Sequence, residues 1–168
     1  MQSSHTAMNG KAASSVPLES PEASKASEPS DGQLLFHKAR NAAYAEAAAG
    51  RISQGMSVLH QALLVEPMRY ELLSDMGALL LAAGELEHAA AFARKAVDLM
   101  PHHGPSLYTL AFALAGLSEH ARAMEILERL TREGPAHTSM LIDAPDLLPL
   151  VALEIERLRR HHDVRATA

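Results

Sequence analysis

Apolar and small residues recur with helical spacing in two runs between residues 70 and 101. The first run, on one side of a helical wheel, comprises Leu73, Met76, Gly77 and Leu80. The second comprises Ala89, Ala93 and Ala96, and Pro101 ends it. The polar segment 84–87 separates the two runs. Small residues on facing sides allow two helices to pack closely, so the pattern predicts an antiparallel helical hairpin.

The hairpin pattern returns at intervals of 34 residues. This spacing separates Pro67, Pro101 and Pro135, and it also separates Gly50, Gly84 and Ser118. A single short hairpin buries too little apolar surface to be stable, so copies of it must stack. The sequence therefore predicts three hairpins, over about residues 36–67, 70–101 and 104–137, with bends at Gly50, Gly84 and Ser118.

A fixed period of 34 residues built from helix, turn and helix is the signature of tetratricopeptide repeats. Over residues 36–137 the chain resembles that family. The resemblance implies an all-α fold, an α-solenoid of three tetratricopeptide hairpins. The first repeat departs most from the pattern, because it has Ala39, Ala42 and Glu46 at positions of larger apolar residues and Gly55 where the other repeats have alanine. An end repeat is expected to be atypical, since one of its faces meets solvent.

The C-terminal part predicts one more helix. Residues 134–144 are expected to form a loop, and the last helix is expected over about 145–162. Its apolar stripe consists of Leu147, Val151, Ile155 and Leu158. We interpret this helix as a cap over the end of the repeat stack, which completes a domain over residues 32–162. Residues 163–168 are predicted to be disordered.

Residues 1–31 are rich in Ser, Ala, Pro and Glu and lack apolar periodicity. Such a segment buries too little surface to offset the entropy of ordering, so a disordered N-terminal tail is predicted. No apolar run follows a basic start, which argues against a secretory signal. The tail is either a partner-binding segment or a solvated extension.

Composition excludes several classes of function. The net charge of −5 gives no general attraction to phosphate backbones, so nucleic acid is not an expected partner. There is no cysteine, which excludes disulfides and thiol catalysis and agrees with a cytoplasmic location. No apolar run approaches the roughly 20 residues of a membrane helix, so membrane insertion is not expected.

Motifs for catalysis or for cofactor binding are missing from the sequence. None of the ten histidines forms an H-x3-H pair, the spacing that places two metal ligands on one helical face. There is no Gly-rich phosphate loop and no G-x-S-x-G elbow. We therefore predict no catalytic residues, no metal site, no cofactor and no enzymatic activity.

The family resemblance places a binding groove on the concave surface, where the first helix of each hairpin lies. Carried over by position, the groove residues are Arg40, Tyr44, Ser74, Ala78, Leu81, Tyr108 and Phe112. One subclass clamps acidic chaperone tails with basic and amide side chains at set positions. Of the corresponding residues here only Arg40 has the right charge, and Asp75 would repel a carboxylate. The groove is instead apolar and aromatic, which suits the apolar side chains of an extended peptide.

Two hypotheses follow for function. In the first, the chain is a non-enzymatic adaptor or chaperone that binds an extended apolar segment of a protein partner. Its size and layout resemble the bacterial type III secretion chaperones of translocator proteins. In the second, it is a structural or assembly factor that self-associates as a homodimer, through the groove or through the stripe from Leu147 to Leu158.

Overall fold

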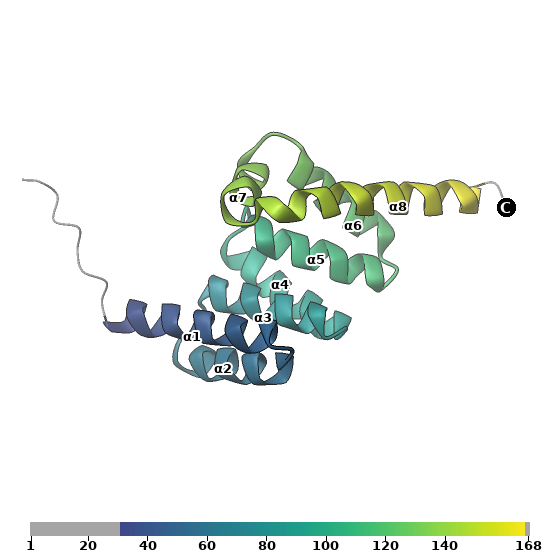
Figure 1. The fold of residues 1–168 in the computed structure, drawn as a ribbon. Coiled ribbons are helices and arrows are strands. Elements are labelled where there is room, and N and C mark those ends of the chain that lie inside the picture. The colour runs from purple at the N-terminus through teal and green to yellow at the C-terminus, as the bar shows by residue number, and fades with distance from the viewer. Residues whose placement is uncertain (1–30, 167–168) are drawn as a thin grey trace, which may run out of the picture.

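The computed structural model describes residues 31–166 of the chain, with side chains described for residues 33–162. These residues form three stacked antiparallel helix pairs, α1 with α2, α3 with α4 and α5 with α6, and α7 and α8 lie at the far end of the stack (Figure 1). The elements are α1 (Asp31–Ala48), α2 (Ile52–Val65), α3 (Tyr70–Ala82), α4 (Leu86–Leu99), α5 (Gly104–Gly116), α6 (His120–Thr131), α7 (Pro135–Asp143), a 3-10 turn (Pro145–Leu147) and α8 (Leu148–Ala166). The predicted all-α solenoid of three hairpins with a C-terminal cap is confirmed. The tail predicted for residues 1–31 lies outside the described residues, except for Asp31.

The three predicted bends have one backbone geometry. Gly50, Gly84 and Ser118 have φ angles of 78°, 80° and 64°, in the left-handed region where helices commonly end. The backbone N–H of the next residue donates to the carbonyl five positions earlier, at 2.9 Å in each bend: Arg51 to Glu46, Glu85 to Leu80 and Glu119 to Leu114. Equal geometry at a 34-residue spacing makes the hairpins repeats of one structural unit.

The first hairpin is closely packed at the residue that departs from the repeat pattern. A Cβ atom on Gly55 would lie 2.6 Å from the backbone oxygen of Ala43, so α1 and α2 leave no room for alanine there. Phe36, Ala43 and Leu59 are buried in this hairpin and pack with Leu72, Leu73 and Met76 of α3. The small residues of the first repeat thus allow close helix approach.

The loop predicted for residues 134–144 is wrong, because this segment contains α7. Pro135 occupies the first turn, where its missing N–H costs no hydrogen bond. Ala136 and Met140, four residues apart, are buried against the third hairpin. Gly104 makes this approach possible, since a Cβ there would lie 2.6 Å from the backbone nitrogen of Met140. Only two buried apolar positions lie in these nine residues, and this was too weak a periodic signal to predict the helix.

The last helix covers the end of the stack, as predicted. Val151, Ile155 and Leu158 of α8 are buried in the core that also contains Ala123 and Leu127 of α6. The helix begins after a 3-10 turn and continues to Ala166, so the boundary predicted at residue 162 is too early. Because the stripe is buried within the chain, the prediction that it meets a second copy is wrong. Within the described part of the chain, no helix combines the length and the apolar character that crossing a membrane requires.

Candidate functional site: a groove along the first helices

A cavity of about 700 Å³ runs along the first helices of the hairpins and is called the groove below. Helices α1, α3 and α5 supply most of its wall, and α7 with the following turn closes one side. The lining residues are Arg40, Tyr44, Tyr70, Glu71, Ser74, Asp75, Ala78, Leu81, Ala82, His103, Pro105, Tyr108, Thr109, Asp143, Ala144 and Leu147. A cavity of this size accommodates several side chains of an extended peptide.

Six of the seven predicted groove residues line this cavity: Arg40, Tyr44, Ser74, Ala78, Leu81 and Tyr108. The exception, Phe112, lies one helical turn along α5 and stacks on Tyr108 with ring centroids 4.2 Å apart. Ser74 is buried, which leaves it little surface to offer. Leu81, Tyr108 and Phe112 are partly buried and pack against the core formed by helices α4 to α8, so they both support the fold and present apolar surface.

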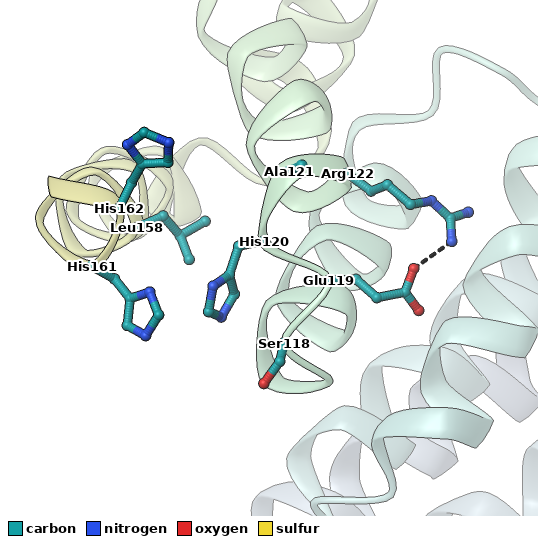
Figure 2. A pocket seen from close by; sticks show the side chains of 8 residues that line it. All are labelled: Ser118, Glu119, His120, Ala121, Arg122, Leu158, His161 and His162. Carbon is teal, nitrogen blue, oxygen red and sulfur yellow. Dashed lines mark hydrogen bonds and ion pairs between the residues drawn. The ribbon is translucent and has the colours of Figure 1, made fainter. Parts of the chain in front are cut away.

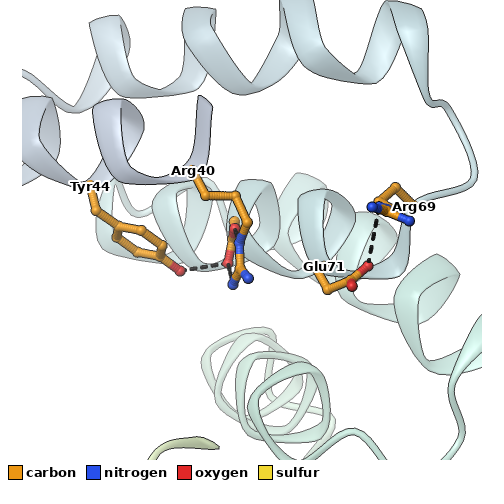
Figure 3. A network of polar contacts seen from close by, with 5 residues as sticks. Arg40, Tyr44, Arg69 and Glu71 are labelled. Carbon is orange, nitrogen blue, oxygen red and sulfur yellow. Dashed lines mark hydrogen bonds and ion pairs between the residues drawn. The ribbon is translucent and has the colours of Figure 1, made fainter. Parts of the chain in front are cut away.

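Arg40 and Tyr44 of α1 are both engaged by Asp75 of α3 (Figure 3). Arg40 Nη2 donates to Asp75 Oδ1 at 3.0 Å, its Nε donates to Oδ2, and the Tyr44 hydroxyl donates to Oδ1 at 2.6 Å. Asp75 is only 2% exposed. Its hydrogen bond raises the pKa of Arg40, while burial and the negative charge of Asp75 raise the pKa of Tyr44 far above its ordinary range. The charge of Arg40 is therefore neutralised by Asp75, and the hydroxyl group of Tyr44 is already hydrogen-bonded within the chain.

This pairing was missed by the sequence analysis, which treated Asp75 as a free charge and Tyr44 as an apolar anchor. A signal was present, since Asp75 follows Arg40 by 35 residues, one more than the repeat period. Opposite charges at nearly equivalent positions of consecutive hairpins face each other when the hairpins stack. Arg40 was the one basic residue at the positions that bind acidic chaperone tails in the related subclass. Because it forms an ion pair with Asp75, it is not available to bind an acidic tail.

The end of the groove nearest α7 contains residues that the sequence analysis did not select. The rings of Tyr70 and His103 meet edge to face with centroids 5.0 Å apart, and His103 Nδ1 lies 2.6 Å from Ser106 Oγ. Burial lowers the pKa of His103, which keeps its imidazole neutral near pH 7. Asp143 lies in the segment that was predicted to be a loop, so its position could not be inferred from the repeat pattern. It lines the groove because it stands at the end of α7.

A second hollow, of about 590 Å³, lies between the start of α6 and the end of α8 (Figure 2). His120 and His161 point toward one another there, with ring centroids 4.6 Å apart in an edge-to-face arrangement, while His162 points away from the pair. These two histidines are 41 residues apart in the sequence, and the packing of α8 against α6 brings them together. Among residues 33–162 no three His, Asp or Glu side chains gather in a group that could hold a metal ion.

The comparisons with known proteins agree with this fold. The sequence model described as tetratricopeptide repeat matches residues 80–141. No curated protein matches the sequence. Residues 80–141 thus match tetratricopeptide repeats by sequence, and the described chain has the tetratricopeptide-repeat fold.

Solved structures of several tetratricopeptide-repeat domains are similar. The domain of Sgt2 from Aspergillus fumigatus is 20% identical with a TM-score of 0.65, over 79% of this chain and 82% of that one. The second such domain of human RPAP3, in complex with the HSP70 peptide SGPTIEEVD, is 11% identical with a TM-score of 0.60, over 76% and 98%. The type III secretion translocator chaperone SycD of Yersinia enterocolitica is 15% identical with a TM-score of 0.61, over 76% and 93%.

Proposed function

We propose that this chain is a non-enzymatic protein-binding module, an adaptor or chaperone that holds an extended apolar segment of a partner in the groove. The observation that carries the proposal is the groove itself, a cavity of about 700 Å³ with Ala78, Leu81 and Tyr108 in its wall. Apolar and aromatic surface in a concavity favours burial of a partner's apolar side chains. Structural neighbours with this fold include one in complex with an HSP70 peptide, which supports a role in peptide binding.

The finer proposal is that the partner is a translocator-like protein and the chain a type III secretion chaperone of the cytoplasm. Its support is the likeness in fold to SycD over most of both chains. A chaperone of this kind keeps apolar segments of its client from aggregating. Co-expression with an aggregation-prone client should therefore raise the soluble fraction of that client, and the increase should require the groove.

The groove is tested with an uncharged peptide and the double variant Tyr108→Ala/Phe112→Ala, which removes the groove ring of Tyr108 and the ring stacked on it. SGPTIQQVN, acetylated and amidated, replaces the acidic residues of the HSP70 peptide by their amides. Truncating a buried aromatic anchor commonly costs about 2 kcal/mol of binding energy. Isothermal titration calorimetry should show binding that the double variant weakens at least tenfold, with helicity by circular dichroism unchanged. Phe92→Ala, on α4 outside the groove, is the matched control. Peptide affinity that ignores the double substitution would contradict the proposal.

A second candidate function, self-association, has its own observation. Leu141 and Ile142 of α7 and Leu150 and Leu153 of α8 are exposed, with Ile142 at 74% and Leu153 at 65%. Exposed apolar residues near one end of a solenoid favour contact with another chain. None of these four residues lines the groove, so self-association through them would not use the groove residues.

A further inference from the structure

The charges around the groove are mostly negative. Its lining contains one cation, Arg40, and three carboxylates, Glu71, Asp75 and Asp143. Arg40 and Asp75 neutralise each other through two hydrogen bonds, which leaves Glu71 and Asp143 to set the character of the groove. The nearby imidazole of His103 adds no positive charge near pH 7, because burial lowers its pKa.

Glu71 and Asp143 act on the same pair of rings, although they lie on α3 and α7. The negative charges of both carboxylates add to burial in raising the pKa of Tyr70, and both oppose the fall in the pKa of His103. Both carboxylates line the groove together with Tyr70 and His103. Asp143 accepts a hydrogen bond from Ser139 at 2.7 Å, which leaves its other carboxylate oxygen to a ligand.

Glu71 is only loosely held by its own cation. Arg69 Nε lies 3.8 Å from Glu71 Oε2, and this oxygen is buried without a hydrogen bond from any described residue. Arg69 is also held elsewhere, since it pairs with Glu66 at 3.1 Å and stacks over Phe36 at 4.3 Å. The Glu71 side chain is 22% exposed and lines the groove, so its carboxylate can accept a hydrogen bond from an added cation.

We propose that the groove selects a segment in which a lysine or arginine accompanies the apolar side chains, and that this cation lies between Glu71 and Asp143 over the ring of Tyr70. The inference rests on the proposed function and adds the charge of the ligand. A cation there gains from both carboxylates and from the aromatic face. An acidic segment meets like charge and finds Arg40 already occupied, so the groove discriminates against it.

Three acetylated and amidated nonapeptides provide the test: SGPTIEEVD, the uncharged SGPTIQQVN and the basic SGPTIKKVK. In calorimetry at low salt, we expect the basic peptide to bind at least tenfold more tightly than the acidic one, with the uncharged peptide between them. The ratio should shrink at 0.5 M NaCl, because salt screens partly exposed charges. Glu71→Gln/Asp143→Asn should reduce the ratio at least threefold, because it weakens binding of the basic peptide.

A control separates the groove from the general acidity of the chain. Glu87→Gln/Asp98→Asn also removes two negative charges, but from exposed positions of α4. It should leave the ratio of basic to acidic peptide affinity unchanged. Equal binding of acidic and basic peptides, or equal effects of the two double variants, overturns the inference while the proposed function stands. If none of the three peptides binds saturably, the proposed function fails, and the inference fails with it.

Discussion

Arg40 of α1 and Asp75 of α3 join the first hairpin to the second through a paired contact, in which Nη2 donates to Oδ1 at 3.0 Å and Nε donates to Oδ2. Tyr44 completes the set with a hydrogen bond to the same carboxylate. Asp75 is buried, whereas the Arg40 side chain keeps 31% of its surface exposed. The arrangement fixes α1, the outermost first helix, and at the same time removes the one cation of the groove from ligand binding.

Removing Arg40 should destabilise the fold more than removing the whole pair. Arg40→Ala leaves a buried carboxylate with Tyr44 as its remaining partner, and breaking such a pair commonly costs about 3 kcal/mol. Arg40→Met/Asp75→Leu replaces both charges by apolar groups and should cost about 1 kcal/mol or less. Urea unfolding at pH 7 measures both. Arg159→Ala, which breaks the exposed pair with Glu156, is the control and should have almost no effect. An Arg40→Ala cost no larger than that of the control would refute the structural role of the pair.

Gly55→Ala should destabilise the first hairpin by about 2 kcal/mol, because the added methyl group meets the backbone of α1 and forces the helices apart. The obstacle is the backbone oxygen of Ala43, 2.6 Å from the new Cβ atom. Gly116→Ala is the matched control, since its Cβ meets only the mobile end of the Leu86 side chain. In thermal unfolding, the melting temperature should fall clearly for Gly55→Ala and change little for the control. Equal melting temperatures for the two variants would contradict the steric explanation.

At the bend formed by Ser118, a substitution by glycine should stabilise the fold. Ser118 has the left-handed φ of 64° that Gly50 and Gly84 adopt without strain. Ser118→Gly should stabilise the chain by up to about 1 kcal/mol, because an L side chain in this conformation is disfavoured. Gly84→Ala should cost about 1 kcal/mol for the same reason, and no atom within 4 Å crowds its Cβ. Chemical denaturation measures both, and a destabilising Ser118→Gly would show that the serine side chain supports the bend.

The repeat pattern was predictable because it depends on local spacing. The interval from Gly50 to Gly84 to Ser118 places the bends, and the stripe from Val151 to Leu158 identifies the cap. Helix α7 was not predictable, since its burial depends on the space that Gly104 leaves in a distant helix.

The groove was predictable by position but not by chemistry. Tyr108 and Leu81 line it as the family resemblance implied, and their place follows from the repeat register alone. The state of Arg40 depends on a partner in the next hairpin, and Asp143 reaches the groove only through α7. Side-chain pairing between repeats depends on the stacking of hairpins, which periodicity along one helix does not describe.

Two leucines of α8 separate capping from self-association. Leu158 is 2% exposed, so Leu158→Glu places a charge in the core and should detach α8 or unfold the chain, at a cost of about 3 kcal/mol or more. Leu153 is 65% exposed, and Leu153→Glu should leave the melting temperature within a few degrees. Sedimentation of the wild type and of Leu153→Glu then tests the second candidate function. A wild-type dimer that Leu153→Glu dissociates supports self-association through α8, and identical sedimentation of both proteins rejects it.

Acidification should weaken the fold partly through His103. Burial lowers its pKa in the folded state, so the unfolded chain binds a proton there more readily. The stability that neutral His103 contributes is therefore fully present above the unfolded pKa of about 6.5 and is lost as the pH falls from there through the lower folded pKa. His103→Gln loses the contact with Tyr70 at every pH but has no proton to bind at this position. The difference in unfolding free energy between wild type and His103→Gln should thus be largest at pH 7.5 and shrink toward pH 5.

His60→Gln, at an exposed position of α2, gives the baseline for removing a histidine. A His103→Gln difference that stays constant from pH 7.5 to pH 5 would show that the imidazole is not held neutral by burial.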